Sequence, residues 1–96
     1  MTITKDQKKQ LKSMAHHLKP VIMIGQHGLT PAVFEEIELT LDQHELIKVK
    51  IAADKKERQV IADKIEHKTQ SQLIQKIGQM GIFFRRNEKS PKIILS

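Results

Sequence analysis

Two glycines three residues apart, Gly25 and Gly28, enclose the stretch of this chain best suited to binding a ligand. Glycine adopts backbone angles that are closed to other residues and carries no side chain to block an approaching group. Between them lie Gln26 and His27. Both side chains can hydrogen-bond a phosphate or a base, and a charged imidazole is favoured beside a phosphate. The loop holds no carboxylate, so its chemistry suits an anion.

The residues on either side of the loop predict how it is held. Residues 21–24 are four consecutive apolar residues, which is typical of a strand covered on both faces. Thr30 and Pro31 are a strong helix start, because the hydroxyl caps N–H groups and proline suits the first helical position. The loop is therefore expected to join a buried strand to a helix N-terminus, whose partial positive charge favours phosphate.

Other kinds of site find little support in the sequence. The loop lacks the GxxxxGK[ST] spacing of a nucleotide-triphosphate loop. His16 and His17 are adjacent and project apart, and no HxxxH spacing occurs, so we expect no metal and no cofactor. No nucleophile–base arrangement or paired carboxylate is evident, so we expect neither catalysis nor a small-molecule substrate. An enzyme using the same loop would need a deep pocket beside it, whereas we expect the loop to be exposed.

Composition limits the classes of protein further. The 96 residues fit one domain over residues 1–96, and the chain has no cysteine and a net charge of +6. No apolar run approaches the length that spans a bilayer, and the N-terminus lacks the apolar core of a signal peptide. We therefore expect a cytoplasmic, monomeric protein without membrane contact. Its positive charge favours a polyanionic partner.

The charges are distributed unevenly along the chain. Residues 1–20 hold five lysines and one aspartate, and residues 48–96 hold twelve basic and five acidic side chains. Between them, residues 29–46 hold five acidic side chains and no lysine or arginine. This division predicts two differently charged faces, with the acidic one away from any nucleic acid. It leaves open an alternative function, a protein-interaction module that docks through the acidic second helix.

Hydrophobic periodicity predicts the order α-β-α-β-α-β-β. The alternating stretch Leu46–Ile51 is expected to run parallel to the first strand, because the helix between them makes a βαβ crossover. Gly78-Gln79 is a candidate hairpin turn between the last two strands. Helices are expected over about 4–17, 31–43 and 54–68, and strands near 21–24, 46–51, 72–77 and 80–85.

Three details follow from these patterns. The N-terminal helix is expected to cover the second face of the strand at 21–24, because that strand shows no alternation. Phe83 and Phe84 point to opposite faces, so we expect one in the core and the other at least partly exposed. Residues 92–95 are considered as a short terminal strand.

Six stretches of the sequence, in this order and spacing, are typical of one known family. They are Leu11-Lys12 through Ala15-His16, Leu18–Val21, Ile24–Thr30, His44–Lys50, Ile77-Gly78 and Arg85. With them the chain resembles, over nearly its whole length, the CRM domain in its stand-alone bacterial, YhbY-type form. The resemblance implies a fold similar to the C-terminal domain of translation initiation factor three, an α/β two-layer sandwich with a mixed four-stranded sheet.

The resemblance also implies a function. Family members use a GxxG loop toward RNA as KH domains do, and the bacterial form is associated with the precursor of the large ribosomal subunit. We therefore predict a non-catalytic protein that binds ribosomal RNA within precursor large subunits. Because the chain holds few aromatic residues, shape and backbone recognition of RNA is favoured over base stacking. The predicted RNA contacts are Gly25, Gln26, His27, Gly28, Lys8, Lys12, Lys19, Arg85 and Arg86.

Two positions depart from the family pattern. Thr69 is followed by Gln70 where the family has glycine, so the helix must end by another route or Gln70 must take a left-handed angle. The last strand ends Phe83-Phe84-Arg85-Arg86 where the family has Leu-Tyr-Arg-Pro. A hydroxyl and a stiff proline are lost there, and a positive charge is gained.

Overall fold

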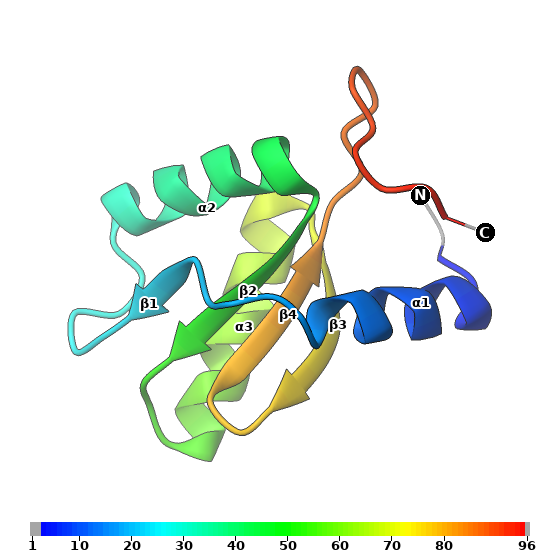
Figure 1. The fold of residues 1–96 in the computed structure, drawn as a ribbon. Helices are drawn as coiled ribbons and strands as arrows, with labels where there is room; N and C mark the ends of the chain where they lie inside the picture. Colours follow the sequence, from blue (N-terminus) through cyan, green and yellow to red (C-terminus); the bar gives the residue numbers. More distant parts are fainter. Residues whose placement is uncertain (1–2, 96) are drawn as a thin grey trace.

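The computed structural model describes residues 3–95 and has the predicted element order around one mixed sheet (Figure 1). The strands lie in the order β1-β2-β4-β3, with β1 and β2 parallel and the other two pairs antiparallel. The α/β fold with a mixed four-stranded sheet is therefore confirmed. The elements are α1 (Lys5–Ala15), β1 (Ile22–Ile24), α2 (Pro31–His44), β2 (Leu46–Ile51), α3 (Lys55–Thr69), β3 (Gln72–Ile77) and β4 (Met80–Phe84).

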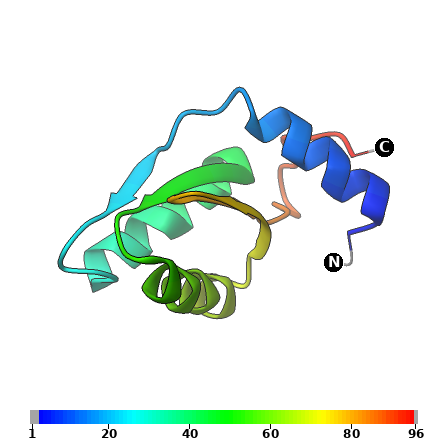
Figure 2. The same ribbon diagram turned by 90° about the horizontal axis from the view of Figure 1, so that it is seen from below.

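The main core lies between the sheet and the helices α2 and α3, which cover the same face (Figure 2). Strand β2 supplies its centre through alternation, since Ile47, Val49 and Ile51 point to this face and are almost fully buried. From the helices, Ile37 and Ile65 pack onto them. Both helices begin at a polar N-cap. Thr30, as the sequence predicts, accepts the N–H of Val33, and Asp54 accepts that of Glu57.

A second, smaller core lies on the opposite face, under α1 and the last residues of the chain. Leu11 and Ala15 of α1 pack with Phe84 and neighbouring apolar residues of the sheet. Phe83 belongs to the main core and Phe84 to this one, and both are buried. The expectation that one of them is partly exposed is wrong, because α1 and the chain end cover that part of the sheet.

Strand β1 is covered on one face only. Ile22 and Ile24 are buried in the main core, whereas Met23 is 66% exposed and Val21, just before the strand, is 45% exposed. Helix α1 packs on the other side of the sheet against β2 and β3, and a connecting segment carries the chain across to β1 (Figure 1). The expectation that the N-terminal helix covers β1 is therefore wrong, because the helix lies over the opposite half of the sheet.

Helix α3 ends by one of the two routes that the sequence leaves open. Gln70 adopts a left-handed angle, φ 57°, and closes α3 while its side-chain amide donates to the carbonyl of His67 at 2.8 Å. The missing family glycine is thus replaced by a strained glutamine.

Residues 92–95 form no strand. They belong to a C-terminal arm, residues 85–95, whose Ile93 packs on the second core.

Candidate nucleic-acid interface

The loop between β1 and α2 is a tight turn closed by its two glycines. The N–H of Gly28 donates to the carbonyl of Gly25 at 3.0 Å. Gly28 has a φ of 64°, in the region that favours glycine, and so lets the chain turn back into α2. The turn therefore depends on the backbone freedom of glycine at Gly28.

Nothing in the described part of the chain covers the loop. Gly25, Gln26 and His27 are exposed, and a Cβ atom placed at Gly25 or Gly28 would meet no atom within 4 Å. The loop projects beyond the end of the sheet as the tip of the molecule farthest from α1 (Figure 1). No acidic side chain lies in it or in the first turn of α2. A long polyanion could approach its backbone from several directions.

Next to the loop, the uncovered face of β1 and the adjoining part of β2 carry a strip of cationic and apolar side chains. Because alternate residues share a face, Val21 and Met23 lie on the same side of the sheet as Lys48 and Lys50 of β2. The parallel register places Met23 opposite Lys50, and the N–H of Val21 bonds the carbonyl of Lys48 at 2.9 Å. We call these four residues the open strip.

The predicted lysines are divided by the fold. Lys19 lies in the connecting segment before β1 and is exposed near Lys48, with which it lines one groove. Lys12, on α1, lines a second hollow with Lys48, on the side of β2 that faces β4 and β3. Lys8 lies one turn farther along α1, in the direction away from the loop (Figure 1). The structure thus brings Lys19 to the open strip and leaves Lys8 remote.

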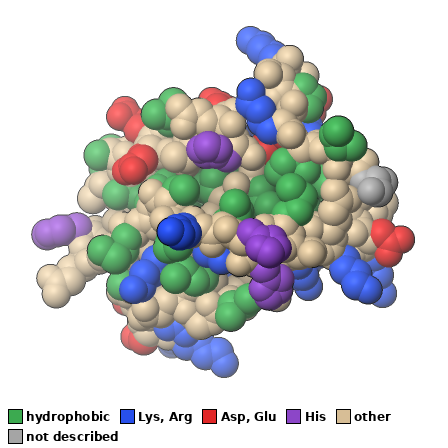
Figure 3. All heavy atoms as spheres, in the orientation of Figure 1, with side chains coloured by type: hydrophobic (Ala, Val, Ile, Leu, Met, Phe, Trp, Pro, Cys, Tyr) green, Lys and Arg blue, Asp and Glu red, His purple; other side chains and the backbone are tan. Residues whose placement is uncertain are grey.

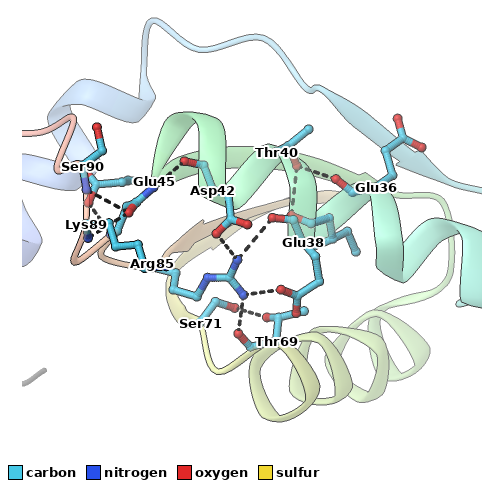
Figure 4. Close-up of polar contacts among 12 residues, drawn as sticks. Glu36, Glu38, Thr40, Asp42, Glu45, Thr69, Ser71, Arg85, Lys89 and Ser90 are labelled. Carbon is cyan, nitrogen blue, oxygen red and sulfur yellow. Dashed lines mark hydrogen bonds and ion pairs between the residues drawn. The ribbon is translucent and has the colours of Figure 1, made fainter.

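The guanidinium of Arg85 is surrounded by groups of the protein itself (Figure 4). It bonds Glu38 Oε2 at 2.7 Å and Asp42 Oδ1 at 2.9 Å, and it also donates to the carbonyl of Thr69 at 2.8 Å. Its side chain is only 19% exposed. Arg85 ties the acidic face of α2 to the end of α3, at the end of the sheet away from the loop. These contacts give it a structural role and lend no support to an RNA contact.

Arg86 also faces inward, toward a buried carboxylate. It bonds Glu45 Oε2 at 3.2 Å and the carbonyl of Ile93 at 2.7 Å. Glu45 is fully buried and accepts the N–H groups of Asn87, Lys92 and Ile93 at 2.6–2.7 Å. Burial raises the pKa of Glu45, but these three backbone bonds and the charge of Arg86 outweigh it and hold the pKa below its ordinary value.

The acidic surface predicted on α2 is partly neutralised within the fold. Glu38 and Asp42 are the partners of Arg85, and Glu45 is held inside the protein. Of this block, Glu35, Glu36 and Asp42 lie exposed on α2, and Asp42 is paired with Arg85. This pairing gives no specific support to docking through the acidic helix.

Lys48 and Lys50 are not among the RNA contacts predicted from the sequence. The sequence does indicate the face they occupy, since the alternation in Leu46–Ile51 places both on the side of the sheet away from the main core. The sequence does not give the position of α1, which covers the start of β2 and leaves that side open at β1 and at Lys48 and Lys50. Within residues 3–95, no cluster of three potential metal ligands occurs and no helix could cross a membrane.

Comparison with known proteins adds a family and a set of relatives. The CRS1/YhbY (CRM) domain matches residues 3–85. A Pseudomonas aeruginosa protein named "Probable RNA-binding protein" is 45% identical over 93 residues, which are 96% of this chain and 89% of that one. A Haemophilus influenzae protein named "RNA-binding protein" is 44% identical over 90 residues, or 93% of this chain and 91% of its own.

A solved structure has the same fold. The solution structure of a hypothetical protein from Staphylococcus aureus matches with a TM-score of 0.83 and 31% identity. The match covers 99% of this chain and 100% of the other. The likeness therefore extends over the whole arrangement of helices and strands.

Proposed function

Because the chain belongs to the CRS1/YhbY (CRM) domain family, we propose that it is an RNA-binding protein that contacts RNA through the Gly25–Gly28 loop. One observation carries the proposal. The loop holds no acidic group, and space for a ligand is open around both glycines. The names of the relatives, "RNA-binding protein" among them, support the same ligand class.

The geometry supports contact with the sugar-phosphate backbone. Glycines allow the main chain of the loop to approach a phosphate closely, and the helix that follows directs its positive end toward it. Gln26 and His27 lie at the tip, where the amide donates hydrogen bonds and the imidazole donates or accepts them. Such contacts position a nucleic acid without reading its sequence.

The lysines of the strip and its surroundings supply most of the attraction. Lys50 lies opposite Met23 on the open strip, Lys19 lies near Lys48, and the three lysines would neutralise phosphates of the bound strand. Affinity then falls as salt rises, because bound phosphates release their counterions. Replacing Lys50 by Gln should reduce the slope of log affinity against log salt by about 1. Lys64→Gln on α3 is the matched control, and it should leave the slope unchanged.

The loop itself is tested by a pair of glycine substitutions. Gly28 and Gly78 both have positive φ values, 64° and 55°, and a Cβ added at either position would meet open space. We expect Gly28→Asp to weaken binding of a ribosomal RNA fragment at least tenfold and Gly78→Asp to weaken it much less. Equal weakening by both substitutions, in proteins that remain folded, would contradict the proposed site and favour general charge repulsion.

The finer biological role is also a proposal. We propose that the RNA is ribosomal RNA within precursors of the large ribosomal subunit, bound in the cytoplasm and without catalysis. The family resemblance supports this role. Tagged protein should co-sediment with large-subunit precursors in a gradient of cell extract, and Gly28→Asp should move it to the unbound fractions. Co-sedimentation that persists in Gly28→Asp would contradict a loop-dependent role.

A further inference from the structure

An apolar groove with a cationic rim lies beside the open strip, on the same face of the sheet. Its volume is about 400 Å³, which is within the range of small-molecule pockets. It runs between the end of α1, the connecting segment and β2, and the C-terminal arm borders it. Figure 3 shows this face, with hydrophobic side chains gathered between histidines.

The chemistry of the groove is divided between its walls and its rim. Leu18 and Leu46 supply buried or half-buried apolar walls. His17, Lys19, His44 and Lys48 supply the polar groups, and no carboxylate lines it. The nearby carboxylate of Glu45 is buried and bonded to the arm, so its charge is already compensated.

We propose that this groove receives an unpaired nucleobase of the same RNA strand that the loop holds. The proposal rests on the function proposed above and specifies the form of its ligand. A base has flat apolar faces, which suit the leucine walls, and imidazole rings are among the groups on which unpaired RNA bases stack. Its attached phosphates match a rim of lysines and histidines without acidic groups. An acidic or polar peptide would leave the apolar walls unmatched.

The groove is continuous with the loop. Val21 lines the groove, and β1 leads from it directly to Gly25. This extended segment covers about 13 Å at roughly 3.3 Å per residue. The open strip lies alongside, with exposed Met23 beside Lys50, so an RNA strand could stay in contact from the loop to the groove.

The experiment compares two RNA hairpins that differ by one unpaired adenine in the stem. Stacking of one base supports a preference of about tenfold for the hairpin with the unpaired adenine. We expect the double variant H17A/H44A to reduce this preference to less than threefold, with His67→Ala on α3 as the control that keeps it. Both histidines of the groove are exposed, so thermal unfolding should confirm an intact fold.

A second, uncharged pair of variants gives an independent measurement. Val21→Asn places an amide in the groove, and Val60→Asn on α3 is matched in side chain and exposure, at 45% against 47%. Val21→Asn should also reduce the preference, and the amide NMR signals of Leu18 and Leu46, which line the groove outside the open strip, should shift more with the adenine-bearing hairpin than with the other. Equal affinity for both hairpins, or a preference unchanged by either groove variant, would overturn the proposal.

The two proposals fail in different ways. If Gly28→Asp abolishes binding of both hairpins while their affinities for the unaltered protein are equal, the loop function stands and the groove proposal is refuted. If neither hairpin nor the ribosomal RNA fragment binds the unaltered protein, the loop function itself is refuted.

Discussion

Glu45 and Arg86 form an ion pair of 3.2 Å in which the carboxylate is fully buried and the guanidinium side chain is 15% exposed. The same carboxylate accepts three N–H groups of the C-terminal arm, and the carbonyl of Glu45 accepts the N–H of Arg85 at 2.8 Å. One residue between α2 and β2 therefore holds the C-terminal arm against the rest of the fold. The arm in turn covers part of the second core and borders the groove.

Replacing Glu45 by Gln should destabilise the protein by about 3 kcal/mol. The amide removes the charge that pairs with Arg86 and replaces one acceptor oxygen by a donor, so buried N–H groups of the arm lose their partner. Urea unfolding measures the change, and Glu88→Gln, on an exposed glutamate of the same arm, is the control with little effect. A loss below about 1 kcal/mol would contradict this role for the carboxylate.

The contribution of Glu45 should also depend on pH. Its pKa is lower in the folded protein than its ordinary value of 4.5, so the unfolded chain binds the proton more tightly. The resulting stability is complete above the ordinary value and is lost as pH falls through the lowered pKa. The difference in unfolding free energy between the unaltered protein and Glu45→Gln should therefore shrink below about pH 4.5. A difference that stays constant between pH 7 and pH 3 would contradict the assignment.

Arg85 should prove to be a structural residue. Arg85→Ala removes its bonds to Glu38, Asp42 and Thr69, and we expect a loss of about 2 kcal/mol in unfolding free energy. Arg85→Lys should restore less than half of it, because an ammonium cannot reach three acceptors in the geometry of a planar guanidinium.

RNA affinity measured well below the melting temperature separates this role from RNA contact. Because the guanidinium is already surrounded by protein acceptors, we expect Arg85→Lys and Arg85→Ala to change RNA affinity less than twofold. A tenfold loss of affinity in a folded Arg85→Ala variant would contradict the structural role and indicate that Arg85 contacts RNA.

Substituting Gln70 by Gly should stabilise the protein. Gln70 holds a left-handed φ of 57°, which costs a residue with a Cβ about 1 kcal/mol relative to glycine. The hydrogen bond from its side chain to His67 offsets part of that cost, so we expect a gain of about 0.5–1 kcal/mol. Gln43→Gly, inside α2, is the contrasting variant and should destabilise by a similar amount. Thermal unfolding that ranks the two variants in the opposite order would refute the explanation.

The sequence alone predicts those features whose causes are local. The strand Leu46–Ile51 follows from alternation, the start of α2 from Thr30 and Pro31, and the turn at the loop from the glycine spacing. The left-handed angle of Gln70 is likewise one of two routes that the sequence leaves for ending α3. Each depends on residues within a few positions of one another, so no knowledge of the rest of the fold is needed.

Only the tertiary structure decides which charged and apolar side chains remain available to a ligand. Lys50 lies within β2 and Arg85 directly follows β4, so the sequence presents both as cations of the sheet. The fold surrounds Arg85 with acceptors and leaves Lys50 on the open strip. Met23 is apolar and yet exposed, because α1 lies over the other half of the sheet. The acidic partners of Arg85, Glu38 and Asp42, lie 47 and 43 residues away in the chain, and the position of α1 depends on its packing against β2 and β3. Local sequence does not specify these distant contacts.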